Sequence, residues 1–204
     1  MSAPQQVLLA YKGAVSNTYA TWNPSDKNAG VTLSNGNLTM TTVTTNYVQA
    51  RSTVGVTSGK WYWEVVYTSI VLSDAMTGIA NGSMSLATGN YVGLDANGWG
   101  VYTPTGNKLH NGANTAYGSA CGANTIMCAL DMDNGKVWWG LNGTWFNSGN
   151  PASGTNAAYT TGITGTIYAC STVLSTNEPT LTANFGATAQ SYSAPSGFNA
   201  GLYA

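Results

Sequence analysis

Two aspartates, Asp131 and Asp133, are the residues whose type and spacing could perform acid–base chemistry. They lie two positions apart in the segment LDMDNGKVWW, so on one strand both side chains point to the same side. A glycosidase needs two carboxyl groups about 5 to 9.5 Å apart across the scissile bond, one with a raised pKa. However, Asn134-Gly135 suits a two-residue type I′ hairpin loop, which would pair Asp133 with Lys136 and Asp131 with Trp138. The hairpin explains both aspartates, so we expect no catalytic residues here.

The single histidine and the three cysteines offer little other chemistry. His110 has no nucleophile-elbow sequence to support a Ser/His/Asp triad, so we expect a hydrogen-bonded loop residue. Cys121, Cys128 and Cys170 cannot all pair within one chain, and none has the spacing of a zinc site. We therefore expect no metal and no cofactor. Burial of the thiols is the favoured interpretation, and a crosslink of Cys121 or Cys170 to a second copy, giving a homo-oligomer, is the less favoured one.

The hairpin also predicts which side chains are buried. Its alternation places seven apolar residues on one face, which must pack against a core: Ile126, Cys128, Leu130, Met132, Val137, Trp139 and Leu141. A second turn at Asn142-Gly143 should bring Trp145 back beside the same strand, giving a three-stranded meander.

Short strand-like runs recur along the whole chain, separated by Gly, Asn, Ser or Pro, and no stretch of useful length has helical periodicity. This pattern predicts an all-β, two-sheet antiparallel β-sandwich. The segment 59–67 is apolar or aromatic on both faces, which is typical of a strand in the middle of a sheet. The predicted strands are 31–33, 38–42, 47–53, 60–68, 77–80, 91–94, 98–102, 125–131, 136–141, 167–173 and 180–185.

Composition limits the classes of partner. Charged residues make up 6% of the 204 residues, against about 25% in an average soluble protein. Six basic and seven acidic residues give no electrostatic footprint for nucleic acid or anionic lipid. The amino-terminal sequence has no basic segment before its short apolar run, so we expect no signal peptide and no membrane insertion.

The chain divides into two parts on these grounds. Residues 1–20 precede the first strong turn signal, Asn23-Pro24-Ser25-Asp26, and we expect them to form an arm or an extra edge strand that serves as an attachment segment. Residues 21–204 should form the sandwich.

Several motifs together resemble the SPRY (B30.2-like) domain, a two-sheet sandwich related to the concanavalin-like lectins. Their order and spacing carry the resemblance over residues 20–200, in the segments WNPSDK (22–27), LSNGNL (33–38), GKWYWEV (59–65), GIA (78–80), KLHNG (108–112), ALDMDNGKVW (129–138), NFG (184–186) and APSGF (194–198). The Asn/Thr/Gly-rich surface is similar to SPRY domains encoded by tailed phages and bacteria.

The resemblance implies binding of a protein or peptide by loops at one rim, with no catalytic residues. Similarity to peptide-binding members places a ligand groove at Asn81, Tyr91, Leu174 and Ser175. A Trp of those members is replaced here by Leu174, so the same ligand is not expected. Three further rim tyrosines could stack on a sugar or pack against a peptide, or simply cover sheet edges: Tyr102, Tyr117 and Tyr159.

These observations favour a non-catalytic binding and assembly module on the surface of a phage virion, as a capsid decoration or tail-associated subunit made in the host cytoplasm. Other virion proteins would be its partners through the arm, and a host glycan or protein through the rim loops. The alternative is a bacterial or phage SPRY interaction module outside any particle. A glycan-active enzyme is the least favoured class.

Overall fold

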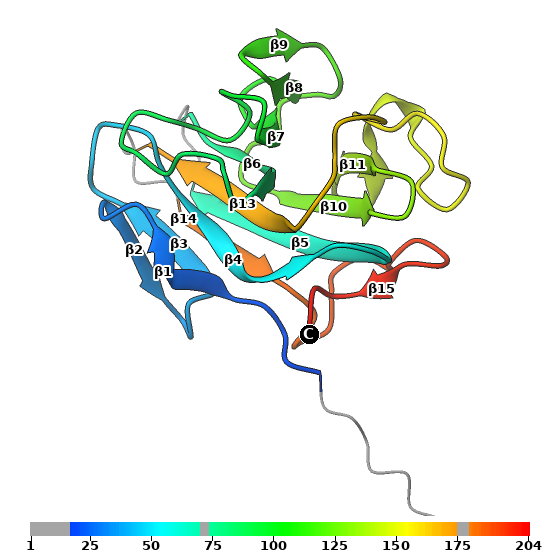
Figure 1. Ribbon diagram of the computed structural model, residues 1–204, viewed down its shortest axis with the longest axis horizontal. Helices are drawn as coiled ribbons and strands as arrows, with labels where there is room; N and C mark the ends of the chain where they lie inside the picture. Colours follow the sequence, from blue (N-terminus) through cyan, green and yellow to red (C-terminus); the bar gives the residue numbers. More distant parts are fainter. Residues whose placement is uncertain (1–16, 70–73, 175–179) are drawn as a thin grey trace, which may run out of the picture.

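The computed structural model describes residues 17–69, 74–174 and 180–204, which form two sheets packed face to face (Figure 1). Among these residues the helical content is one short 3₁₀ turn, η1 (Phe146–Ser148). The predicted all-β antiparallel sandwich is confirmed. In the described part of the chain, no helix has the length and apolar character to cross a membrane.

The first sheet has seven antiparallel strands. Half of the pairings in this sheet join strands that are not consecutive in the chain. In spatial order the strands are β1 (Trp22–Lys27), β4 (Val48–Val56), β13 (Ile167–Val173), β6 (Met76–Asn81), β7 (Gly98–Tyr102), β8 (Asn107–His110) and β9 (Ala113–Thr115).

The second sheet has eight strands, one of which, β15 (Asn199–Ala200), pairs in parallel with β5 (Lys60–Ser69). The long strand β5 lies in the middle of this sheet, as the two-sided pattern of residues 59–67 predicts. The order of the other strands is β12 (Thr144–Trp145), β11 (Lys136–Leu141), β10 (Thr125–Asp131), β5 (Lys60–Ser69), β14 (Thr180–Asn184), β3 (Thr39–Thr42) and β2 (Val31–Ser34).

The core between the sheets is rich in tryptophan. Trp22 and Trp99 enter it from the first sheet, and Trp63 and Trp139 from the second, all at most 2% exposed. The predicted buried face of the hairpin is confirmed, because all seven of its residues belong to this core or pack against it. The three thiols, at Cys121, Cys128 and Cys170, are also buried and free, as favoured by the sequence. Burial raises the pKa of Cys121 to about 12, which keeps that thiol protonated.

The predicted register of the hairpin is wrong by two residues. Asp131 pairs with Lys136, and Cys128 with Trp139, so the loop has four residues instead of two. Gly135 has a positive φ of 60°, but Asn134 does not, because its backbone N–H and side-chain amide instead bond to the Asp131 carboxylate. A shift of two leaves every side chain on its predicted face. The second turn is confirmed, with Asn142 at φ 47° and Gly143 at φ 86° joining β11 to β12.

Two local predictions fail for identifiable reasons. Residues 91–94 form turns and no strand, because they belong to a segment that crosses the outside of the first sheet. The turn expected at Asn23-Pro24-Ser25-Asp26 is instead edge strand β1, whose pairing with β4 is irregular between Trp22 and Lys27. Proline is tolerated at such an edge because its missing N–H faces no partner strand.

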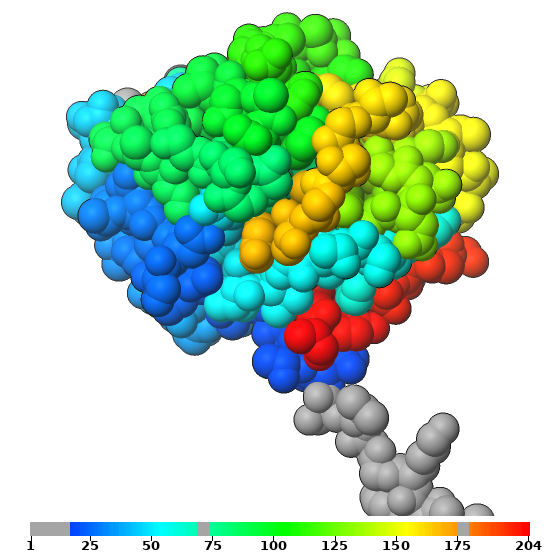
Figure 2. Space-filling view, in the orientation of Figure 1, coloured from blue at the N-terminus to red at the C-terminus, as the bar shows by residue number. Residues whose placement is uncertain are grey.

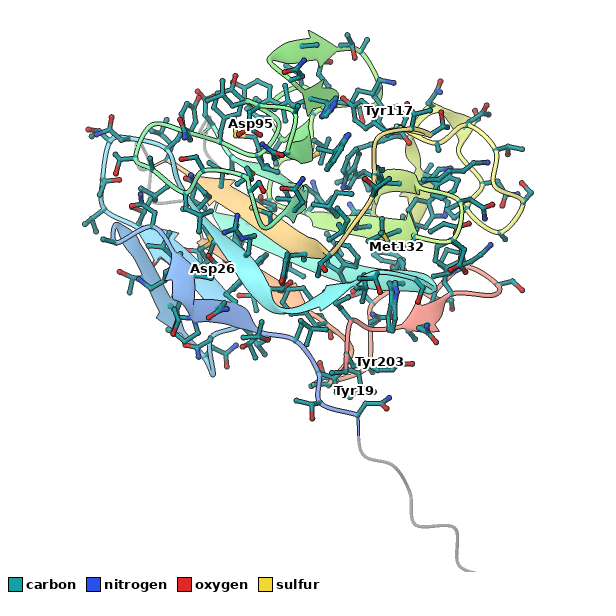
Figure 3. The ribbon with its side chains drawn as sticks, in the orientation of Figure 1. Tyr19, Asp26, Asp95, Tyr117, Met132 and Tyr203 are labelled. Atoms are coloured by element: carbon teal, nitrogen blue, oxygen red, sulfur yellow. The ribbon has the colours of Figure 1, made fainter. Side chains whose placement is uncertain are left out.

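The two ends of the described chain meet. Thr18 and Ala204 exchange backbone hydrogen bonds of 3.2 and 3.0 Å, and the rings of Tyr19 and Tyr203 pack edge to face (Figure 3). Residues 17–20 therefore belong to the sandwich. The other residues of the arm expected at 1–20, namely 1–16, lie outside the described residues.

The outer face of β5 is covered by the carboxyl-terminal segment. Glu64 is fully buried there. Its carboxylate accepts hydrogen bonds from the backbone N–H groups of Ser191 and Tyr192, each 2.8 Å, and from the Tyr62 hydroxyl, 2.9 Å. These bonds satisfy a carboxylate that would otherwise be costly to bury.

Candidate binding site

The segment that connects β6 to β7, residues 82–97, lies across the outer face of the first sheet. It contributes Met84 and Val92 to a small apolar cluster with Met76 and Ala80 of β6 and Leu109 of β8. In Figure 2 this segment, in green, borders the blue and cyan surface of the neighbouring strands without a gap. The outer face of this sheet is thus covered and carries a second, smaller core.

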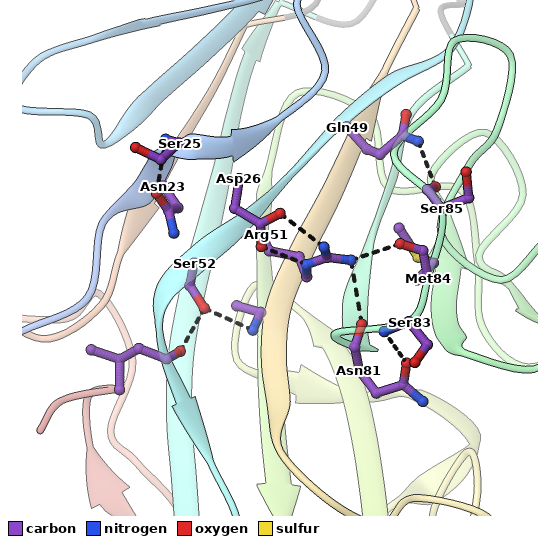
Figure 4. Close-up of polar contacts among 12 residues, drawn as sticks. Asn23, Ser25, Asp26, Gln49, Arg51, Ser52, Asn81, Ser83, Met84 and Ser85 are labelled. Atoms are coloured by element: carbon purple, nitrogen blue, oxygen red, sulfur yellow. Dashed lines mark hydrogen bonds and ion pairs between the residues drawn. The ribbon is translucent and has the colours of Figure 1, made fainter.

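Arg51 holds this segment in place from strand β4. Its guanidinium donates two bonds to the Asp26 carboxylate, 2.7 and 2.8 Å, in a bidentate pair (Figure 4). It also donates to the carbonyls of Met84, 2.8 Å, and Asn81, 3.3 Å. Gln49 adds bonds to two further carbonyls of the segment. Such charge-assisted bonds give the segment a defined position on the sheet.

A pocket of about 190 Å³ opens beside this covered face. Half-buried tyrosine rings form much of its wall, and the Tyr47 and Tyr91 rings are 5.3 Å apart and tilted by 60°. The elements that supply its lining lie at the end of the molecule remote from the carboxyl terminus, where β8 and β9 project (Figure 1). The lining residues are Tyr47, Met76, Tyr91, Tyr102, Leu109 and Asn114.

One carboxylate binds two of these tyrosines. The Tyr47 hydroxyl donates to Asp74 Oδ2 at 2.8 Å, and the Tyr102 hydroxyl donates to Asp74 Oδ1. Burial, together with these bonds and the charge of Asp74, raises the pKa of Tyr102 to about 12 and also raises that of Tyr47. Both hydroxyls therefore keep their protons at neutral pH and direct them at Asp74.

The structure brings part of the predicted groove to this pocket. Tyr91 and Tyr102 line it, and Leu174 follows β13 at the same end of the sheet, where Thr172 pairs with Met76. Ser175 lies outside the described residues.

Asn81 is separated from those positions. It ends β6, five residues from Met76, which is about 17 Å along an extended strand. Its amide donates to the Asn97 side chain, its Oδ1 accepts from the Ser83 N–H, and its carbonyl accepts from Arg51, so it anchors the 82–97 segment. The predicted groove thus splits into two places.

The other two predicted tyrosines lie near the core, and Tyr117 is labelled at the upper right in Figure 3. Tyr117 is 8% exposed and packs edge to face on Trp139. Tyr159 is half-buried and also packs on Trp139, while the Lys108 ammonium lies 4.9 Å from its ring centroid. Both tyrosines therefore pack against the interior through Trp139.

The aspartate pair does not form a glycosidase site. Asp131 is 1% exposed and its carboxylate accepts from Lys60 Nζ at 3.0 Å, whereas Asp133 is exposed and accepts from the Gly59 N–H at 2.6 Å. Burial acts to raise the pKa of Asp131, but the bonds from Asn134 and Lys60 outweigh it and hold that pKa below its usual range. A general acid needs the opposite shift.

His110 also has a structural role. It closes strand β8 and does not lie in a loop, its Nδ1 donates to the Gly98 carbonyl at 2.8 Å, and its ring stacks on Trp99. Among the described residues, no group of three or more His, Cys, Asp or Glu side chains is placed to hold a metal ion.

Among the polar residues of the site, the sequence-based prediction missed Tyr47 and Asn114, which line the pocket, and Asp74, which binds two of its tyrosines. They come from the start of β4, the approach to β6 and strand β9, which only the sheet order brings together. Tyr47 lies in a predicted strand, and no local pattern distinguishes it from a tyrosine that covers a sheet edge.

A family model for the SPRY domain matches residues 60–186, more than half of the chain. The chain belongs to the SPRY domain family. SPRY domains are a protein-interaction fold and are generally non-catalytic. The matched region contains most of the pocket lining, and Tyr47 lies before it.

Solved structures share the fold of this SPRY domain. The SPRY domain of human HERC1 aligns with a TM-score of 0.65 at 19% identity, covering 79% of this chain and 96% of that one. Stonustoxin aligns with a TM-score of 0.62 at 18% identity over 81% of this chain, which matches 27% of the toxin chain. The TRIM65 PSpry domain gives a TM-score of 0.58 at 15% identity, covering 81% and 89%. Identities at this level show a shared fold.

Proposed function

We propose that this SPRY domain is a non-catalytic module that binds a protein partner through the pocket formed by Tyr47, Tyr91 and Tyr102. The observation that carries the proposal is this pocket, whose half-buried aromatic rings and hydroxyls come from strands of the first sheet and from the 82–97 segment, which Arg51 holds in place. Aromatic side chains supply large contact area with little loss of entropy, as binding surfaces require. The elements that supply the pocket lining are also remote from Thr18 and Ala204, where the two ends of the described chain meet (Figure 1).

We further propose that the domain is displayed on the surface of a phage virion, as a decoration or tail-associated subunit attached through residues 1–16. The nearly uncharged Asn/Thr/Ser/Gly-rich composition, with 6% charged residues, supports an exterior role. In this arrangement the amino-terminal end faces the particle and the pocket faces outward.

Deletion of residues 1–16 tests attachment. The deletion should abolish incorporation into particles, measured by mass spectrometry of purified virions, and leave the unfolding transition of the sandwich unchanged. It ends before Thr18, so the pairing with Ala204 is retained. Incorporation that survives the deletion would contradict the attachment role and favour an interaction module outside any particle.

Tyr91→Ala tests the pocket. This variant should be incorporated normally but lose adsorption to the host, because it removes one wall of the pocket. Tyr203→Ala, a half-buried tyrosine at the opposite end of the molecule, is the matched control and should adsorb like the parent. A glycan array on the same proteins separates the ligand classes, since retention of a sugar by the parent would oppose a protein partner.

A further inference from the structure

The hydroxyl groups of the pocket are prepared to accept hydrogen bonds. Tyr47 and Tyr102 each donate their single proton to Asp74, so only the lone pairs of their oxygens remain for a ligand. Asp74 accepts one bond on each oxygen and, with two lone pairs on each, keeps further acceptor capacity. The pocket wall therefore favours a ligand that carries N–H donors.

Asp74 brings a negative charge close to the pocket. Of the two ion pairs formed among the described residues, one joins Arg51 to Asp26 and the other Lys60 to Asp131, so neither involves Asp74. The Asp74 carboxylate is half-buried and lies one hydroxyl group away from the pocket, where its field is screened less than at an open surface.

The tyrosine rings favour a cation as well. An aromatic face is the negative part of the ring quadrupole and attracts an ammonium or guanidinium group within about 6 Å of its centroid. The rings of Tyr47 and Tyr91 are 5.3 Å apart and tilted by 60°, and both line the pocket.

The size of the pocket limits what it can hold. Its 190 Å³ corresponds to the liquid volume of about six water molecules at roughly 30 Å³ each. Ligand pockets for whole small molecules usually measure about 300 to 1,000 Å³. The space suits the end of one side chain, and Met76 and Leu109 provide apolar contact for its methylene stem.

We propose that this pocket takes the cationic head of a lysine or arginine side chain presented by the protein partner. The inference rests on the proposed function and names the chemistry of the same site. Tyr91 supplies the ring face, Tyr47 and Tyr102 accept N–H bonds, and Asp74 provides the countercharge through their hydroxyls.

Titration of the full chain with capped amino acids tests the proposal. The probes are the Nα-acetyl methylamides of arginine, lysine and citrulline, with tetramethylammonium chloride as a fourth, followed by NMR of the labelled protein. Arginine and lysine should shift the resonances of Tyr47, Tyr91 and Tyr102. Citrulline is a neutral near-isostere of arginine and should bind at least about tenfold more weakly, since it lacks the charge that strengthens such bonds.

Variants assign the parts. Asp74→Asn keeps the shape of the side chain and should weaken arginine binding by about tenfold or more. Tyr91→Ala should weaken it by about threefold or more, whereas Tyr91→Phe keeps the ring and should stay within about twofold of the parent. Tyr91 lies on the surface segment, so its variants remain informative even if Asp74→Asn disturbs folding.

Three results would overturn the proposal. Equal binding of citrulline and arginine would show that charge does not contribute to binding. Absence of shifts at the pocket tyrosines would show that the probes do not bind in this pocket. Tetramethylammonium bound as tightly as lysine would show that N–H donation is not used, and would favour a quaternary ammonium headgroup. If the partner protein still binds the parent, and binds Asp74→Asn equally well, the proposed function stands and this inference alone fails.

Discussion

Replacing Arg51 with methionine should release the 82–97 segment from the outer face of the first sheet. Arg51 is 6% exposed and bridges four elements: strand β4, which carries it, strand β1 through Asp26, the end of β6 through the Asn81 carbonyl, and the segment through the Met84 carbonyl. Methionine has a similar length and fills much of the same space, so the substitution removes the charge and the hydrogen bonds with little loss of volume.

The expected cost follows from the partners left behind. Removing one member of a fully buried ion pair costs about 3 to 5 kcal/mol. The Asp26 side chain is 34% exposed and can regain water, which lowers that cost. The two carbonyls lose bonds to a charged donor, worth roughly 1.5 kcal/mol or more each. We expect the free energy of unfolding to fall by about 3 to 5 kcal/mol.

Urea denaturation gives this loss, and hydrogen exchange of residues 82–97 locates it. The control is Lys136→Met, because Lys136 is half-buried and donates one bond, to the Gly154 carbonyl, far from the segment. It should cost about 1 kcal/mol or less and leave exchange in the segment unchanged. A loss below about 0.5 kcal/mol for Arg51→Met, with exchange in the segment like that of the parent, would refute the reasoning.

Three further predictions concern the hairpin and the sheets. Asp131→Asn should destabilise the protein at pH 7, and the difference in unfolding free energy from the parent should shrink as the pH falls below about 4. Because folding lowers the pKa of Asp131, its stabilising effect is present above the pKa of the unfolded state and is lost as the pH falls through the pKa of the folded state. A constant difference between pH 7 and pH 2 in urea titrations would contradict this prediction. Trp139→Ala should cost about 3 to 5 kcal/mol in the same assay, since the ring is fully buried, and a loss under about 1 kcal/mol would be inconsistent with that burial. Gly78→Ala should abolish or severely weaken folding, seen as a loss of the cooperative thermal transition, because its Cβ would lie 2.0 Å from the Trp99 carbonyl oxygen. Gly82→Ala is the control, since its Cβ would meet nothing within 4 Å. Equal melting temperatures for the two variants would count against this packing.

The sequence pattern of the hairpin predicts which face is buried, but it does not predict the register. The alternation of apolar residues around Trp139 predicts the buried face of the hairpin correctly, although the turn type and the register are wrong. A side-chain period of two makes the face insensitive to an even shift of register. The register itself depends on how the Asp131 carboxylate caps the loop, which no propensity of the Asn-Gly pair includes.

The candidate site was predicted in part. The structure brings Tyr91 and Tyr102 to one pocket, whereas Asn81 anchors the 82–97 segment, and Tyr117 and Tyr159 pack on the core. Aromatic residues at loops look alike in sequence whether they face solvent, a ligand or another ring. Their roles depend on neighbours supplied by other strands.

Strand periodicity, turn residues and motif order are properties of neighbouring positions, so they predict the all-β class, the tryptophan-rich interior and the family resemblance. The pocket, by contrast, exists only in the folded chain. Its parts come from the start of β4, the approach to β6, the 82–97 segment and strands β7 to β9, which the pairing order of the first sheet brings together. The Asp74 carboxylate acquires its two tyrosine donors from positions 27 and 28 residues away in the chain, a contact that exists only after the sheet has formed.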